Sequence, residues 1–281
     1  MTTEMTPVRR ATRQLIQPDL PEFDSSGLDP ALRTAIADLL LTMADDEFVV
    51  GFRDSEWTGI APMLEEDVAF SSLAQDEIGH ARLLYELRSA LTGEDPDRLA
   101  FHRQPSEYRH ARLLDQPRQG WAFTIARRWL YDTADSIRLA GLAASSFAPL
   151  ADVVAKIRRE ERYHLMHLNA WLERLGTHHG KPRGKVLSAL KALNPIASSV
   201  FAPIANEEML VDAGVLSAPM SVLAARWRSE ANARLCALNL RPISDAPPAA
   251  DGRDHAVPDE SFVWLWNEFT SVARLEEGVE W

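Results

Sequence analysis

The sequence has a single cysteine, Cys236, among its 281 residues. One cysteine can form neither an internal disulfide nor a thiolate cluster for zinc or iron–sulfur binding. Any metal must therefore be held by His, Asp or Glu. A chain without disulfides suits a reducing compartment, and we predict a cytoplasmic location.

Basic residues and long apolar runs are also scarce. Lys and Arg number 30 against 41 Asp and Glu, a formal net charge of −11, which argues against a general nucleic-acid binder that neutralises phosphates with clustered cations. The most apolar stretch, residues 139–155, is interrupted by Ser145, Pro149 and Asp152, whereas a membrane-spanning helix needs about 20 predominantly apolar residues. The arginines near the N-terminus precede no apolar segment, so no secretory signal is predicted.

The composition is that of a folded globular protein, with 46% hydrophobic and 25% charged residues. Three early prolines and a Ser-Ser-Gly run predict a flexible segment over residues 1–28. We expect the remainder, residues 29–281, to be one domain. Its core would be a bundle over about 30–175, with accessory helices over about 185–281.

Apolar residues recur at three- and four-residue spacing in several segments and predict an all-α fold. The long segments are 30–54, 63–91, 121–147 and 149–175, and the shorter ones are 185–201, 221–238 and 260–274. Asp29 is the expected N-cap of the first helix, and Gly93 and Gly176 are the expected stops of the second and fourth. Short connections predict antiparallel neighbours, and therefore a four-helix bundle with additional C-terminal helices.

Two Glu-x-x-His motifs are the most informative residues. Glu77 and His80 lie in the second predicted helix, and Glu161 and His164 in the fourth. Residues three apart share a helix face, so each carboxylate and imidazole can converge on one ion. Two such motifs, with one further carboxylate from each remaining helix, form the ligand set of di-iron and di-manganese carboxylate bundles.

The other two helices supply those carboxylates at matching positions. Glu47 lies 30 residues before Glu77, and Asp132 lies 29 residues before Glu161. Near-equal offsets bring carboxylates to one level in two antiparallel helix pairs. All six residues fall on apolar stripes, where an unpaired charge is costly and a metal would compensate it. We predict a metal site formed by Glu47, Glu77, His80, Asp132, Glu161 and His164, with no separate catalytic residue.

Alternatives stay open at this point. A single Glu-x-x-His arises often by chance, and its side chains can simply be solvated. Asp46, Asp54 or Asp135 could replace Glu47 or Asp132 if the helix phase differs. Carboxylate-rich sites with one imidazole per metal favour iron, with manganese as the alternative. Two ferrous ions bridged by carboxylates can reduce dioxygen, so monooxygenation is the expected reaction class.

Several stretches resemble the PaaC (also called PaaI) family, ferritin-like subunits of the multicomponent phenylacetyl-CoA monooxygenase that epoxidises the aromatic ring. They are residues 55–57, 61–67, 124–132, 163–164, 252–255 and 262–281, and the resemblance covers nearly the whole chain after Asp29. It implies a ferritin-like fold, a homologous PaaA-like catalytic partner, other monooxygenase components and assembly into an oligomer of like or unlike chains. It also implies phenylacetyl-CoA as substrate of the complex and electrons from an NAD(P)H-dependent reductase.

The resemblance leaves three hypotheses. Members of the PaaC group are regarded as structural partners with degenerate metal sites, whereas this sequence keeps both motifs. The chain is therefore either a metal-binding oxygenase subunit, a structural subunit beside a catalytic partner, or a stand-alone ferritin-like oxidase. Seven arginines between positions 98 and 128 could bind the anionic CoA, or they could be scattered solvated residues. The seven are Arg98, Arg103, Arg109, Arg112, Arg118, Arg127 and Arg128.

Overall fold

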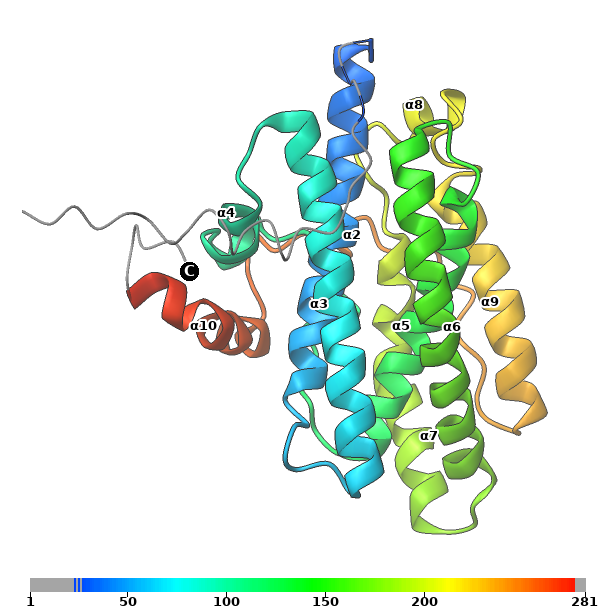
Figure 1. Ribbon diagram of the computed structural model, residues 1–281. Helices are drawn as coiled ribbons and strands as arrows, with labels where there is room; N and C mark the ends of the chain where they lie inside the picture. The colour runs from blue at the N-terminus through cyan, green and yellow to red at the C-terminus, as the bar shows by residue number, and fades with distance from the viewer. Residues whose placement is uncertain (1–22, 24, 26, 276–281) are drawn as a thin grey trace, which may run out of the picture.

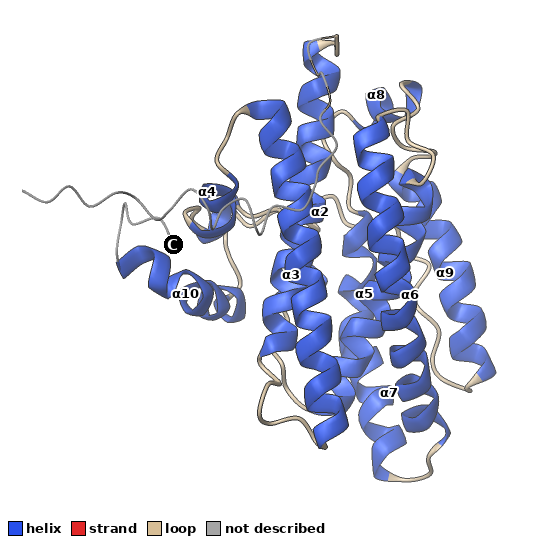
Figure 2. Cartoon of the chain, viewed as in Figure 1, coloured by secondary structure: helices blue, strands red, loops and turns tan. Residues whose placement is uncertain are grey.

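The computed structural model describes residues 23, 25 and 27–275. Most of the predicted flexible segment, residues 1–22, 24 and 26, lies outside the described residues, as do residues 276–281. Every regular element in the described part of the chain is helical, and no strand occurs there (Figure 2). The predicted all-α, ferritin-like architecture is confirmed.

Four long helices form the bundle (Figure 1). They are α2 (Pro30–Ser55), α3 (Leu64–Thr92), α5 (Trp121–Leu142) and α6 (Ala148–Thr177), with α2 beside α3 and α5 beside α6. Asp29 caps α2 as predicted, because its carboxylate accepts hydrogen bonds from the backbone N–H groups of Ala31 and Leu32. Gly93 ends α3 in the left-handed conformation at φ 77°, which glycine adopts without strain.

The ends of the second helix pair differ from the prediction. α5 ends at Leu142 rather than Phe147, because the backbone there bonds to a distant segment: Gly141 O accepts from Ser217 N, and Ser146 N donates to Gly214 O. Gly176 is not a stop, since α6 continues to Thr177. A Cβ at Gly176 would come within 3.2 Å of Leu240 Cδ1, so this glycine permits close packing instead.

The region between the two pairs, predicted to be irregular, contains short helical pieces. These are α4 (Pro96–Phe101), η1 (Pro105–Glu107) and η2 (Arg112–Asp115). The C-terminal part contains α7 (Lys181–Leu193), η3 (Asn194–Phe201), α8 (Glu207–Asp212), α9 (Met220–Ala237) and α10 (Glu260–Leu275). The short helix α8 was not predicted. Around α5 pack α6, α7, η3 and α9, which leaves α5 buried on nearly all sides.

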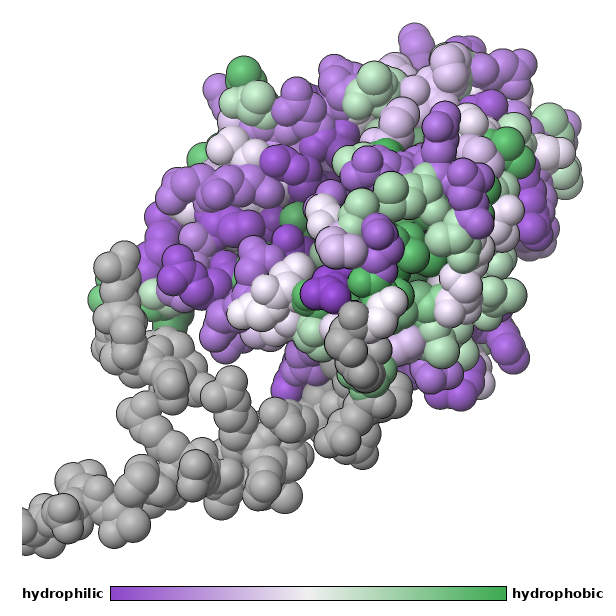
Figure 3. All heavy atoms as spheres, turned by 90° about the horizontal axis from the view of Figure 1, so that it is seen from above, coloured by the Kyte–Doolittle hydropathy of each residue, from purple (hydrophilic) through white to green (hydrophobic). Residues whose placement is uncertain are grey.

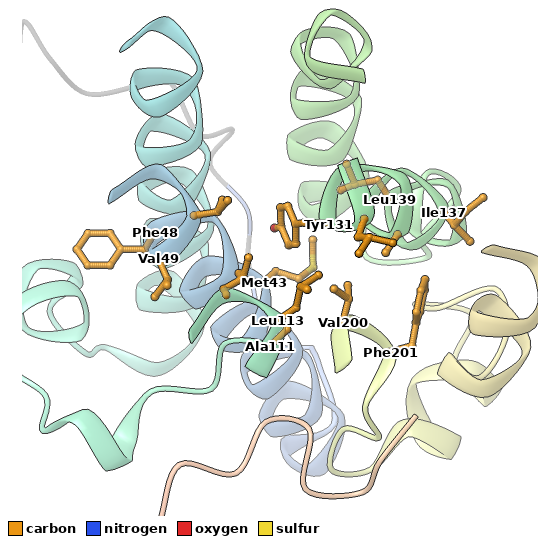
Figure 4. Close-up of a cluster of buried hydrophobic side chains, with 14 of the residues drawn as sticks. Met43, Phe48, Val49, Ala111, Leu113, Tyr131, Ile137, Leu139, Val200 and Phe201 are labelled. Carbon is orange, nitrogen blue, oxygen red and sulfur yellow. The ribbon is translucent and has the colours of Figure 1, made fainter. Parts of the chain in front are cut away.

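The core continues from the bundle into these accessory segments (Figure 4). Met43 of α2 and Tyr131 of α5 lie close to Leu113 of η2 and Val200 of η3, all four buried. The described accessory segments therefore close one side of the bundle with apolar side chains, and burial of this kind contributes roughly 25 cal/mol per Å² of apolar surface.

The C-terminal helix α10 lies apart from α9, next to α4 (Figure 1). Phe269 makes edge contacts with Phe48 of α2 and Tyr108, and Trp266 Nε1 donates to the carbonyl of Arg103. The apolar face of α10 is thus covered by α2 and the region between the helix pairs.

The surface mixes residue types. Viewed from above in Figure 3, hydrophilic residues cover most of one side of this face and hydrophobic residues gather on the other. In the described part of the chain, no helix combines the length and the apolar character that crossing a bilayer requires.

Candidate metal centre

The structure brings all six predicted ligands to one level inside the bundle. Glu47 comes from α2, Glu77 and His80 from α3, Asp132 from α5, and Glu161 and His164 from α6, and all six side chains are buried. The helical periodicity that placed them on apolar stripes is therefore correct. Whether they bind metal stays a prediction.

One group consists of Glu47, Glu77, His80 and Glu161, each offering one ligand atom within 4.8 Å of the others. His80 Nδ1 lies 3.4 Å from Glu47 Oε2 and 3.5 Å from Glu77 Oε2. Three carboxylates and one imidazole are the donor types that iron and manganese accept.

A second group consists of Asp132, Glu161 and His164. His164 Nδ1 lies 2.9 Å from Glu161 Oε1 and 3.3 Å from Glu77 Oε1. Glu161 belongs to both groups, and Glu77 contacts both histidines. These two carboxylates therefore lie where the two groups meet.

Each histidine is held from outside by a carboxylate of the opposite helix. His80 Nε2 lies 2.7 Å from Glu160 Oε2 of α6, and His164 Nε2 lies 3.2 Å from Asp76 Oδ2 of α3. Such outer carboxylates orient a ligating imidazole and make it more basic. Sequence reasoning missed both residues, although each directly precedes a motif glutamate, so that the repeated unit is acid-Glu-x-x-His.

Unpartnered polar atoms test whether the residues suit a cation. Within the described residues, Glu77 Oε2, His164 Nδ1 and both carboxylate oxygens of Glu161 are buried without a hydrogen-bond partner. Buried polar atoms normally find a partner, and an unmet one costs about 1–3 kcal/mol. Through Glu77 Oε2 and the Glu161 oxygens, the first group fits one divalent ion by donor type, spacing and unmet bonding capacity. His164 Nδ1 and both oxygens of Asp132 leave unmet capacity in the second group as well.

A buried arginine that sequence reasoning did not place at the site contacts residues of both groups. Arg128 is fully buried, and its Nη2 donates to Glu77 Oε1 at 2.6 Å. Its Nη1 lies 3.1 Å from Asp132 Oδ1, and its Nε lies 3.1 Å from Asp54 Oδ2. The signal for it was present, because Arg128 lies one helical turn before Asp132 on the same face.

Protonation balances the remaining charge of the metal-free site. Burial and the neighbouring Glu77 raise the pKa of Glu47 well above its usual range, and burial likewise raises that of Asp132. Burial alone would raise the pKa of Glu77, but the Arg128 guanidinium holds it well below. Burial lowers the pKa of His164, yet Glu161 and Glu77 outweigh this and raise it to about 11.

The three carboxylates considered as alternative ligands, Asp46, Asp54 and Asp135, pair with arginines instead. Asp46 pairs with Arg138 at 2.5 Å and with Arg253 at 2.8 Å, and Asp135 also pairs with Arg138. Asp54 faces Arg128, and burial raises its pKa to about 6. None of the three replaces Glu47 or Asp132 in the groups described.

Two further residues position the glutamates. Tyr131 donates its hydroxyl hydrogen to Glu47 Oε1 at 3.0 Å from α5. On α2, one turn after Glu47, a Cβ at Gly51 would lie 3.1 Å from Glu77 Cβ and 2.9 Å from Ile78 Cγ1. The missing side chain lets α2 and α3 approach closely at the level of the site.

Four of the seven arginines that could bind CoA or be solvated instead make contacts within the fold. Arg127 and Arg128 are fully buried. Arg103 pairs with Asp45, and Arg112 donates to the carbonyls of Asp251 and Asp254. Their concentration in the sequence reflects internal pairing within the fold.

A separate histidine pair lies away from the centre, under the C-terminal segment. The rings of His110 and His255 stack with centroids 4.1 Å apart, and His110 Nε2 lies 2.7 Å from Asp115 Oδ1. Burial lowers the pKa of His110 to about 3 and that of His255 to about 4. Both rings are therefore neutral at physiological pH.

A family model described as phenylacetic acid catabolic protein matches residues 24–281. The chain belongs to this family. It is 33% identical to the C subunit of 1,2-phenylacetyl-CoA epoxidase from Escherichia coli (strain K12) over 191 residues, which cover 68% of this chain and 77% of that relative. The resemblance to the PaaC group is thereby confirmed.

The A subunit of the same Escherichia coli epoxidase is also similar. It is 26% identical over 121 residues, which cover 43% of this chain and 39% of that relative. The family relationship therefore extends to two different components of one enzyme, with the higher identity to the C subunit.

Proposed function

We propose that this chain is a component of a multisubunit monooxygenase that epoxidises the aromatic ring of phenylacetyl-CoA in phenylacetate catabolism. The observation that carries the proposal is the 33% identity to the C subunit of the epoxidase together with buried carboxylate and histidine groups contributed by all four bundle helices. A PaaA-like protein is the expected partner, and an NAD(P)H-dependent reductase the expected electron source.

The resident metal we propose is iron, with manganese as the alternative. Glu47, Glu77, His80 and Glu161 would hold it, and bound iron would supply the reduction of dioxygen. Within this chain, Glu160 orients His80, and Tyr131 orients Glu47. The fully buried packing around Glu77 and Asp132 excludes water from the site.

The family relationship also supports a second candidate, a structural subunit whose partner performs the chemistry. The specific observation in its favour is Arg128, whose charge already compensates Glu77 and Asp132 without metal. A stand-alone oxidase is the third alternative, and oxygen consumption by the isolated chain with Fe²⁺ as the electron donor, without partner or reductase, would support it.

Reconstitution separates the first two candidates. The chain is co-purified with its PaaA-like partner, and oxygen- and NAD(P)H-dependent turnover of phenylacetyl-CoA is measured with and without it. Turnover should require the chain, and full turnover in its absence would reject both subunit roles. Glu77→Ala and Glu161→Ala variants that still co-purify should lose turnover if the chain's own metal takes part, and should keep it if the role is structural.

A further inference from the structure

Arg128 occupies the part of the site where a second metal ion would have to bind. Its guanidinium contacts Glu77 and Asp132, the two carboxylates that flank the position defined by Asp132, Glu161 and His164. An ion ligated by Asp132 Oδ1 would lie beside Arg128 Nη1, which is 3.1 Å from that oxygen. Two like charges so close in a buried site repel strongly.

Arg128 cannot make room for a metal ion by losing its proton or by moving into solvent. A guanidinium stays protonated at all physiological pH values. The Arg128 side chain is fully buried, and its departure would leave Asp54 and Asp132 without the cation that they contact. Removing one partner from a buried ion pair is strongly destabilising.

The other cation position is free of this conflict. Glu77 divides its two oxygens, since Oε1 accepts from Arg128 while Oε2 faces His80 without a hydrogen-bond partner among the described residues. Glu47 and Glu161 complete that group around the Nδ1 atom of His80. Both halves contain buried ligand atoms without a hydrogen-bond partner among the described residues, including Asp132 Oδ2 and His164 Nδ1 in the second half. The difference between the halves is the Arg128 guanidinium, which already contacts Glu77 and Asp132.

We propose that Arg128 takes the place of the second metal, so that the chain binds a single divalent ion at Glu47, Glu77, His80 and Glu161. This inference rests on the proposed metal site. It predicts a mixed centre of one ion and one guanidinium, joined through the carboxylate of Glu77. Any reduction of dioxygen in this chain would then use one iron rather than a dinuclear pair.

The experiment uses the full chain loaded with Mn²⁺ after removal of bound metal. Bound manganese is counted by mass spectrometry, and its electron paramagnetic resonance spectrum distinguishes isolated ions from exchange-coupled pairs. We expect about one ion per wild-type chain with the spectrum of isolated Mn²⁺, and about two coupled ions in Arg128→Met, where the charge is removed but most of the stem volume stays.

Two matched variants separate charge from general disruption. Arg128→Lys keeps the positive charge and should still bind about one ion. Arg127→Met changes a neighbouring, equally buried arginine that donates to the carbonyl of Gln116, and it should also bind about one. Circular dichroism verifies that each variant is folded.

The possible outcomes separate the role proposed for Arg128 from the metal site on which it rests. A coupled pair of ions in the wild type would overturn the role of Arg128 and leave the metal site intact. Absence of bound manganese from the wild type would overturn both. One ion in the wild type and also in a folded Arg128→Met variant would refute the proposal that Arg128 takes the place of a second metal ion. If Arg128→Met does not fold, the wild-type count and spectrum still decide.

Discussion

His80 of α3 and Glu160 of α6 form a hydrogen bond of 2.7 Å across the bundle, and the opposite pair, His164 of α6 and Asp76 of α3, repeats it at 3.2 Å. Each Glu-x-x-His motif therefore has its imidazole oriented by the acid that precedes the other motif. The Nδ1 atoms of both rings point to the buried carboxylates as a result.

Glu160→Gln should weaken metal binding by roughly 10-fold or more, since a neutral amide holds the His80 ring less firmly and makes it less basic. Glu160 is 40% exposed, so the fold should tolerate the change. The measurement is a Mn²⁺ titration followed by calorimetry. Glu173→Gln is the matched control on the same helix, because Glu173 pairs with Arg234 at the surface, away from the candidate ligands. Equal affinities for the two variants would contradict an orienting role of Glu160.

Gly51→Ala should destabilise the protein by about 1 kcal/mol, because the added methyl would press on Ile78, the Ala74 carbonyl and Glu77 and outweigh the better helix propensity of alanine. Gly79→Ala is the counterpart within the motif of α3. Nothing lies within 4 Å of the position that a Cβ at Gly79 would take, so Gly79→Ala should raise the free energy of unfolding by about 0.5–1 kcal/mol. Urea unfolding measures both. A stabilised Gly51→Ala would mean that α2 and α3 do not depend on this close approach.

Arg253→Met should cost about 3 kcal/mol or more of unfolding free energy. Arg253 joins the C-terminal segment to the bundle through Asp46, at 2.9 and 2.8 Å, and through the carbonyl of Val200 at 2.8 Å. Its loss leaves the buried Asp46 with Arg138 and the backbone N–H of Ala111 as partners. The half-buried Arg112→Met, which loses contacts with backbone carbonyls, should change stability by less than about 1 kcal/mol. Similar denaturation midpoints for the two variants would contradict this ranking.

Acid should destabilise the protein through His255, whose pKa burial lowers to about 4. Below about pH 6.5 the unfolded imidazole takes up a proton that the folded one does not, so stability falls as the pH falls toward 4. The loss from His255 between pH 7 and pH 5 is about 2 kcal/mol. The His255→Gln variant should show a correspondingly shallower decline in urea unfolding. Asp115, whose pKa burial raises to about 6, has the opposite dependence.

Mn²⁺ binding should release protons and tighten as the pH rises. In the metal-free site the pKa values of His80 and His164 are raised, the latter to about 11, as are those of Glu47 and Asp132. A ligating imidazole must lose its extra proton before it can bind. Calorimetric titrations in two buffers of different ionisation enthalpy count the released protons. Equal apparent enthalpies in both buffers would contradict a protonated resting site.

The local features of this protein follow from its sequence alone. Asp29 ahead of Pro30 sets the start of α2, and the three-residue spacing of Glu77 and His80 places both on one helix face, because helix geometry depends on neighbouring residues. Apolar periodicity likewise identified the four bundle helices and the burial of all six candidate ligands.

The pairing of the buried charges, in contrast, depends on the tertiary fold. Arg253 lies 207 residues after Asp46 in the chain, yet the two form a buried ion pair, so Asp46 is not a ligand of the candidate centre. Arg128 was grouped by sequence with arginines that could be solvated, but it is buried and donates to Glu77 of another helix. The early end of α5 has the same origin, since its last backbone groups bond to residues 214–217. Spacing along a helix reports which face a residue occupies, whereas the partner of a buried charge depends on which chain segments the packed core brings together.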